Sequence, residues 1–230
     1  MHLYRLVRTA QPEASFLAAA SSVALLVKIF FLNRMPGAFP GAQEAGVLVE
    51  AILCSVIASY VFYLIVVHLK DRKEKAILYP FISKHASRIV GECAGQLVEI
   101  SKRSEVPVAL DDLSNLNDAF SKIPPYSDAP LIINRSLQYA NWFQYFDFHN
   151  GRTKESIRRL LDQLPYLDAE LVSLISAIDD CAHFWVVTTS LNNPSSNPNL
   201  EVWADPFLKY CQLCHELETY LNKWVSENAP

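Results

Sequence analysis

Residues 46–69 have the sequence GVLVEAILCSVIASYVFYLIVVHL, a run too long and too apolar for an ordinary soluble domain. Glu50 stands near its start, and no charged side chain interrupts it from Ala51 to Val67. An α-helix rises about 1.5 Å per residue, so a helix over this run would cross a hydrocarbon core roughly 30 Å thick. Soluble core helices rarely stay apolar on every face for such a length. We therefore expect a transmembrane helix over residues 46–69.

A second apolar run occupies residues 14–32, where Lys28 is the one charged residue. Two arginines precede it, which is also a feature of cleaved signal peptides. However, Pro40 stands where cleavage after Ala42 requires a small residue, and the apolar run is too long for a signal peptide. We therefore expect another transmembrane helix over residues 14–32, preceded by a tail at residues 1–13.

The connection between the two runs, residues 33–45, contains two prolines and two glycines, which end a helix and permit a tight reversal. A connection this short makes the two spans antiparallel neighbours. The sequence therefore predicts an N-terminal transmembrane hairpin.

Basic residues predict how this hairpin is oriented. Lys70, Arg72, Lys73 and Lys75 follow the second span, whereas the connecting loop carries a single arginine. Lysine and arginine concentrate on the cytoplasmic side of a membrane, so we expect both termini in the cytoplasm and the loop outside, in a bacterial inner membrane. We expect the cluster to be a flank that stops transfer and has no other role. The alternative is contact with anionic lipid headgroups, at about 1 kcal/mol per well-placed cation.

Small residues recur at every fourth position in both spans. They are Ala14, Ala18 and Ser22 in the first, and Ala51, Ser55 and Ser59 in the second. Such stripes let helix backbones approach closely in lipid. We expect them to pack the two helices of one hairpin together, and self-association of hairpins from separate copies is the alternative.

Lys28 and Glu50 are the charged residues inside these spans, and each lies about four residues from the connecting loop. They should share a depth, where an unpaired charge costs up to a few kcal/mol, so an ion pair between them is one possibility. At 100° per residue, however, both point away from a seam built on the small stripes. We therefore expect both side chains to snorkel to the interface. The alternative is contact with a neighbouring copy, which would line an oligomer with polar groups.

Residues 70–230 have the helical periodicity of a soluble domain. Apolar stripes cover residues 89–100, 110–120, 157–164, 167–185 and 207–224, with a turn expected at His149–Gly151 and Thr153 capping the next helix. Strand-like alternation is almost absent, and a loop rich in Asn, Pro and Ser covers residues 192–199. We expect an all-α protein in which a cytoplasmic bundle of five or six helices follows the hairpin.

The segment Cys211-Gln212-Leu213-Cys214-His215 has the C-x-x-C-H spacing of haem attachment in c-type cytochromes. A cytoplasmic location argues against haem. Zinc is the stronger alternative, because Cys211, Cys214 and His215 fall within roughly 100° of one helix, and Cys181 or His183 could add a fourth ligand. Cys214 also belongs to an apolar stripe, so we expect core packing and no cofactor.

Two further pairs have residue types that occur in catalysis. Asp179 and His183 are four apart, and we expect a surface pair. Asp147 and His149 flank the expected turn and lack an identifiable third partner. The sequence contains no phosphate-binding glycine loop, no H-E-x-x-H, no nucleophile elbow and no kinase signature. A net charge of −4 argues against direct nucleic-acid binding.

These features favour a membrane-anchored, non-enzymatic interaction or sensing module that contacts lipid and a cytosolic protein partner. In layout, the two-span hairpin with Lys28 and Glu50 and its helical domain resembles the membrane effectors of bacterial anti-phage systems, including retron-associated two-span proteins. It is similar also to many uncharacterised bacterial two-span proteins. The resemblance implies a membrane-permeabilising effector held inactive by a cytosolic partner, and it carries no residue assignments. A metal- or thiol-dependent enzyme is the third reading.

Overall fold

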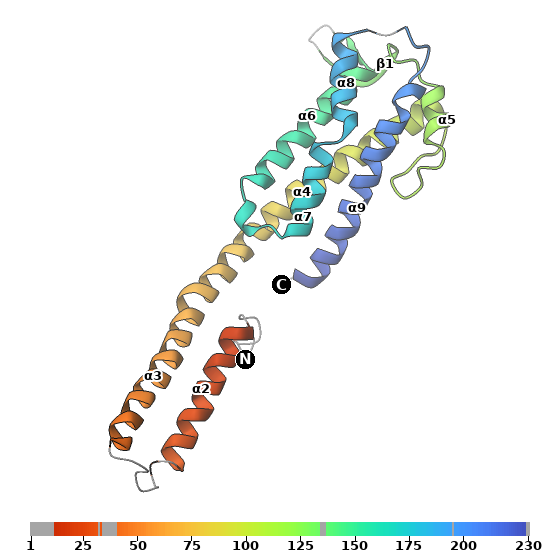
Figure 1. Ribbon diagram of the computed structural model, residues 1–230. Coiled ribbons are helices and arrows are strands. Elements are labelled where there is room, and N and C mark those ends of the chain that lie inside the picture. Colours follow the sequence, from red (N-terminus) through yellow and green to blue (C-terminus); the bar gives the residue numbers. More distant parts are fainter. Residues whose placement is uncertain (1–11, 32, 34–40, 134–136, 195, 229–230) are drawn as a thin grey trace. The chain divides into compact units, whose positions relative to one another are not determined.

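The computed structural model describes residues 12–31, 33, 41–133, 137–194 and 196–228, with side chains at all of these except 42, 71, 72, 75 and 225–228. The chain divides into two compact units, residues 1–77 and 78–230. Helices dominate both units, as Figure 1 shows, and this confirms the all-α expectation in outline.

The first unit contains two helices that pack against each other, α2 (Pro12–Phe30) and α3 (Ala42–Phe62). Gly41 precedes α3 with a φ of 89°, a left-handed conformation that glycine adopts without steric cost. A π-helical segment, Tyr63–His68, follows α3 and leads into α4 (Leu69–Ser104). Gln43–His68 therefore forms one long apolar helix.

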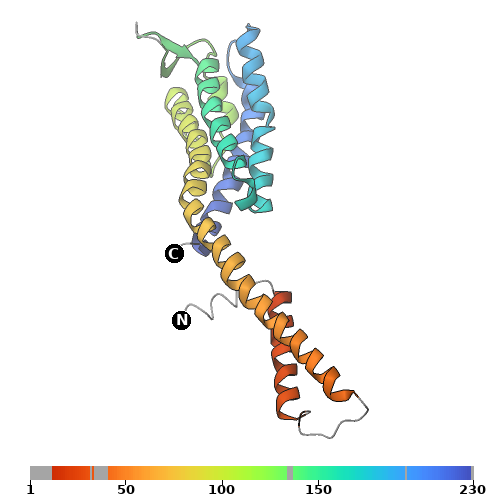
Figure 2. The same ribbon diagram turned by 90° about the vertical axis from the view of Figure 1, so that its left-hand side faces the viewer.

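The second unit begins within α4 and contains the remaining elements. These are α5 (Leu116–Ser121), β1 (Asp128–Ile132), β2 (Tyr139–Asn141), α6 (Trp142–Leu161), α7 (Ala169–Asp179), α8 (Ala182–Asn192) and α9 (Ala204–Asn228), with short 3-10 helices at Leu164–Tyr166 and Glu201–Trp203. Helix α6 packs on α7 and α8, and α9 packs on α5, α7 and α8. In Figure 2, the axes of α4, α6 and α8 lie roughly parallel within this unit, and α6 runs in the opposite chain direction to α4.

The core of the second unit is contiguous and strongly aromatic. Its largest fully buried side chains include Trp142, Phe146 and Phe207, and Phe146 lies 5.5 Å from Phe207 between ring centroids. Burying one such ring removes a large apolar area from water, which is the main favourable contribution to folding. Helices α4, α6 and α9 supply most of this core.

Several sequence predictions in this unit were wrong. The chain forms a small antiparallel sheet, in which Asp128 lies opposite Asn141 and Ile132 opposite Tyr139. Helix α6 runs through the turn expected at residues 149–151, because an Asn141–Gln144 capping box starts it earlier and Asn150 is buried within it. Thr153 is therefore a buried residue of α6 and caps no helix.

Two other boundaries also differ. The helix expected from residue 110 is confined to α5, because residues 107–115 form a loop closed by an isolated bridge between Ala109 and Asp112. The stripe over residues 167–185 spans two helices, which are separated at Asp180 and Cys181. The apolar period continues across this break, so periodicity alone did not reveal it.

Candidate functional site

The seam of the hairpin follows a three–four spacing rather than the small-residue stripes. On α2, Ala18 and Ser21 are the buried residues of the span, and Leu25 and Lys28 continue the same face. On α3, the half-buried positions are residues 46, 50, 53, 56, 57 and 60. Positions spaced alternately by three and four stay on one face, whereas every fourth position drifts around the helix.

This spacing corrects the packing expected for the second span. Ala51, Ser55 and Ser59 are exposed on the outside of α3, so they do not contact α2. In the first span, Ala18 is buried while Ala14 and Ser22 are partly buried. The stripe of α2 therefore borders the seam, and the stripe of α3 faces away from it.

Lys28 and Glu50 meet within this seam. Lys28 Nζ lies 2.5 Å from Glu50 Oε2, and the two side chains retain 12% and 42% of their exposure. Gly46 lies beside the lysine, and a Cβ added there would be 3.5 Å from Lys28 Cε, an ordinary van der Waals contact. The expectation that both charges point away from the seam was wrong, because the seam passes through positions 28 and 50 themselves.

A second polar contact closes the other end of the hairpin, where Ser15 Oγ lies 2.8 Å from Tyr60 OH. The Ser22 hydroxyl donates to the Ala18 carbonyl of its own helix at 2.8 Å. Each of these hydroxyl groups therefore has a hydrogen-bond partner within the two helices.

The basic cluster after the second span lies at the start of α4. Lys70 and Lys73 are exposed, and Lys70 Nζ is 3.8 Å from Glu74. The side chains of Arg72 and Lys75 lie outside the described residues. The two described lysines are accessible to an anionic surface.

The C-x-x-C-H segment lies on α9, where its members point in different directions. Cys211 and Cys214 are fully buried, whereas His215 is exposed and lies 3.7 Å from Glu218. Cys93 of α4 meets the cysteine pair inside the core, with 3.5 Å between its sulfur and that of Cys211. In the part of the chain that the structure describes, no group of three or more His, Cys, Asp or Glu side chains is arranged to hold a metal ion.

These buried cysteines are free thiols in a weakly polar environment. Burial raises the pKa of Cys93 and of Cys214 well above the usual value for a thiol, with smaller contributions from the neighbouring sulfurs. A thiol with a raised pKa carries little thiolate at neutral pH and reacts slowly. The arrangement fits core packing better than nucleophilic chemistry.

His183 is a core residue and forms no surface pair with Asp179. It is 1% exposed at the start of α8, and its ring lies about 5 to 6 Å from those of Phe146, Phe207 and Tyr210. Burial lowers the pKa of His183 to about 3. The expected surface pair was wrong because α7 ends at Asp179 and the chain turns before His183.

A buried carboxylate that the sequence reading missed connects α4 with α6. Glu92 is 7% exposed, and it accepts from His149 Nδ1 at 2.7 Å and forms an ion pair with Arg152, whose Nε lies 2.8 Å from Glu92 Oε1. Arg88 Nε lies 3.5 Å away on the same helix as Glu92. The position of Glu92 next to Cys93, inside an apolar stripe, is the one sequence signal for a buried charge here. His149 therefore pairs with Glu92 rather than serving with Asp147.

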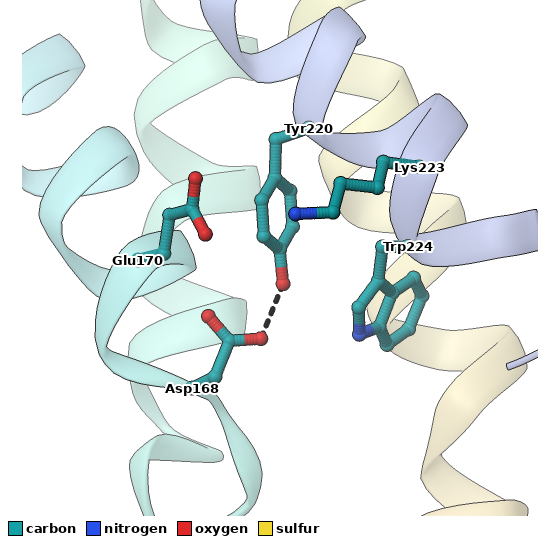
Figure 3. Close-up of a pocket in the computed structure, with 5 residues that line it drawn as sticks. All are labelled: Asp168, Glu170, Tyr220, Lys223 and Trp224. Atoms are coloured by element: carbon teal, nitrogen blue, oxygen red, sulfur yellow. Dashed lines mark hydrogen bonds between the residues drawn. The ribbon is translucent and has the colours of Figure 1, made fainter. Parts of the chain in front are cut away.

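A cavity of about 220 Å³ lies between α7 and α9 (Figure 3) and is lined by Asp168, Glu170, Tyr220, Lys223 and Trp224. Both carboxylate oxygens of Asp168 are engaged, one by the backbone N–H of Leu171 at 2.8 Å and the other by the Tyr220 hydroxyl. Trp224 stacks on Tyr79 at 4.5 Å between ring centroids. These contacts join α7, α9 and α4, so the cavity lining has a clear structural role.

Comparisons with protein-family models, with curated proteins and with solved structures give no match to this chain. The class is therefore defined by structure alone, as a mostly helical protein. Within the described residues, three helical segments are long and apolar enough to cross a membrane: Pro12–Phe30, Gln43–His68 and the α7–α8 segment Ala169–Asn192.

Proposed function

We propose that this protein is a membrane-anchored, non-enzymatic interaction or sensing module. Its first two apolar helices would form a transmembrane hairpin in a bacterial inner membrane. The unit at residues 78–230 would lie in the cytoplasm and bind a protein partner there.

One observation supports this proposal most directly, namely the difference in burial among the three apolar helices. In Ala169–Asn192, 39% of the apolar window is buried in the core of the second unit. The corresponding values are 11% for Pro12–Phe30 and 0% for Gln43–His68. Side chains such as Phe16, Leu48 and Phe62 are more than 60% exposed, an arrangement that water disfavours and lipid accepts.

The Lys28–Glu50 pair is compatible with a bilayer location. Two charges that neutralise each other at one depth avoid most of the cost of a lone charge among lipid chains. The lysines after the second span support a cytoplasmic position for the second unit, by the usual bias of basic residues.

The proposal is tested by fractionating cells that express the full-length protein and by purifying it in mild detergent. We expect it in the membrane fraction after an alkaline wash, and we expect a cytosolic protein to co-elute with it. Recovery of the full chain from the aqueous fraction, monodisperse without detergent, would overturn the membrane assignment. A specific partner missing from the eluate would overturn the interaction module.

A membrane-permeabilising effector is the second candidate, and the exposed face of α3 favours it. Glu50 keeps 42% of its side-chain exposure, and Ser55 and Ser59 present hydroxyls on the outside of the hairpin. Assembly of several hairpins through these polar groups could line a pore. If this holds, expression without a partner is toxic and Lys28→Ala or Glu50→Ala relieves the toxicity. Harmless overexpression with intact membrane potential would exclude it.

A further inference from the structure

The α4–α6 surface of the second unit carries a group of cations, which we call the arginine strip and define as Lys84, Arg88, Arg152 and Arg159. The first two lie on α4 and the others on α6. The side chains of the three arginines are 39%, 43% and 50% exposed, and Lys84 is also exposed. Two carboxylates, Glu92 and Glu155, contact the strip.

Each of these arginines contacts its carboxylate through Nε. Arg152 contacts Glu92 through Nε at 2.8 Å, and Arg159 contacts Glu155 through Nε at 2.7 Å. Arg88 approaches Glu92 through Nε as well, at 3.5 Å. The Nη atoms of a guanidinium carry four of its five N–H donors, and these are the groups that bind carboxylates and phosphates. Glu92 is 7% exposed, so it fixes two arginines from beneath and leaves the outward surface cationic.

The lowered pKa of the buried residue His85 is consistent with a positive local charge at the strip. His85 is 4% exposed between these cations, and its pKa is lowered by burial first and then by Arg159, Lys84 and Arg88. Glu155 opposes this effect more weakly. Positive charge therefore outweighs negative charge around His85, in a chain whose net charge is −4.

An aromatic side chain borders the strip. Phe148 is 45% exposed, and the guanidinium carbon of Arg152 lies 5.7 Å from the centre of its ring. Exposed aromatic rings beside arginine are enriched at the centres of protein–protein interfaces. Along the helix axes the cations extend about 6 Å on α4 and about 10 Å on α6, which suits carboxylates spaced along a chain better than a single phosphate group.

We infer that the arginine strip, with Phe148 at its border, binds an acidic segment of a partner protein. This inference rests on the proposed function and specifies the chemistry of the partner. Charge complementarity would orient the partner, and the arginines held by Glu92 would bind its carboxylates with little loss of side-chain entropy.

The test uses full-length protein in a non-ionic detergent and a fluorescein-labelled decaglutamate peptide as the probe, with binding followed by anisotropy. The test variant is Lys84→Gln/Arg159→Gln, which leaves the contacts of buried Glu92 with Arg88, His149 and Arg152 intact. The matched control is Lys70→Gln/Lys73→Gln, which removes the same charge from the segment after the second span. Phe148→Ala tests the aromatic border separately.

We expect the dissociation constant to rise about fivefold or more in Lys84→Gln/Arg159→Gln, from the loss of two exposed ion pairs, and less than about twofold in the control. Wild-type binding should weaken as salt rises from low to physiological ionic strength. Absence of binding by the wild type, or equal losses in both double variants, would overturn the inference.

A competition experiment with lipid tests whether the strip binds lipid headgroups instead of an acidic peptide. Short-chain phosphatidylserine, added below its micellar concentration, should not displace the peptide. Displacement that is lost in Lys84→Gln/Arg159→Gln would assign the strip to lipid headgroups and overturn the inference. Membrane anchoring is read out by fractionation and not by this assay, so failure of the strip and failure of the proposed function are distinguishable.

Discussion

The imidazole of His183 is packed among aromatic rings at the start of α8, and this makes the second unit sensitive to acid. Burial lowers its pKa in the folded protein to about 3, whereas the pKa of an unfolded histidine is about 6.5. The unfolded chain therefore binds the proton more readily, and the stabilisation is complete above about pH 6.5. It is lost as pH falls from there toward 3, at about 1.4 kcal/mol per pH unit.

We predict that His183→Phe flattens this dependence. Between pH 7 and pH 5, the free energy of unfolding of the wild type should fall by about 2 kcal/mol more than that of the variant. Urea unfolding in detergent, followed by tryptophan fluorescence at both values, measures the difference. Exposed His215→Gln is the control and should match the wild type. Parallel curves for wild type and His183→Phe would contradict the prediction.

The contact between Lys28 and Glu50 gives a second residue-scale prediction. Lys28→Met or Glu50→Gln leaves one charge without its partner, which costs up to a few kcal/mol inside lipid. The exchange Lys28→Glu/Glu50→Lys should recover most of this loss. Unfolding by sodium dodecyl sulfate in mixed micelles measures all three, with exposed Ser55→Ala as a near-neutral control. An exchange variant no better than the single variants would argue against the pair.

These two residues illustrate what the sequence can and cannot predict. Their common depth followed from counting residues to the loop, but their pairing depended on which face of each helix forms the seam. The small-residue stripes predicted the wrong contact face, because the observed seam lies beside the stripe on α2 and on the other side of α3 from its stripe. Glu92 was missed for a related reason, because its partners Arg152 and His149 are 57 or more positions away in the chain.

At the scale of elements, Asp168 couples the start of α7 to α9. One oxygen caps α7 through the N–H of Leu171, and the other accepts from the Tyr220 hydroxyl, as Figure 3 shows. Asp168→Ala removes both contacts and should lower the free energy of unfolding by about 2 to 3 kcal/mol. Asp168→Asn retains a capping oxygen and should cost about 1 kcal/mol.

Urea unfolding of the full-length protein compares these two variants, and Tyr220→Phe isolates the hydroxyl contact. We expect the free energy of unfolding to be highest for the wild type and lowest for Asp168→Ala, with Asp168→Asn and Tyr220→Phe between them. Equal destabilisation by the alanine and asparagine variants would show that the cap contributes nothing.

Element boundaries were predicted less well than element types, and α6 shows why. Its sequence contains His149-Asn150-Gly151, which favours a turn locally. The helix continues because Asn150 and Thr153 are buried, Thr153 lies 3.3 Å from Tyr210 of α9, and the capping box at Asn141 fixes an earlier start. Packing against other helices outweighs local preference, and single-sequence patterns do not contain that information. The β1–β2 pair was missed because β2 is only three residues long.

At the scale of the whole molecule, the two units should differ in the solvent that each requires. Residues 78–230 bury a contiguous core that includes Trp142, Phe207 and Tyr210. Residues 12–31 and 41–68 leave most of their apolar side chains exposed. A fragment of residues 78–230 should therefore be soluble and monodisperse without detergent, while the full chain should require detergent.

Size-exclusion chromatography with light scattering measures the oligomeric state of the fragment and of the full chain, each with and without detergent. Circular dichroism checks that the fragment is helical. The matched control is the full chain with Leu48→Lys and Ile52→Lys, two exposed positions of α3, which should lose membrane association while the second unit stays folded. A fragment that aggregates, together with a full chain that is monodisperse in water, would reverse the assignment of the two units. Aggregation of the fragment alone would instead indicate that α4 needs the residues before position 78 to fold.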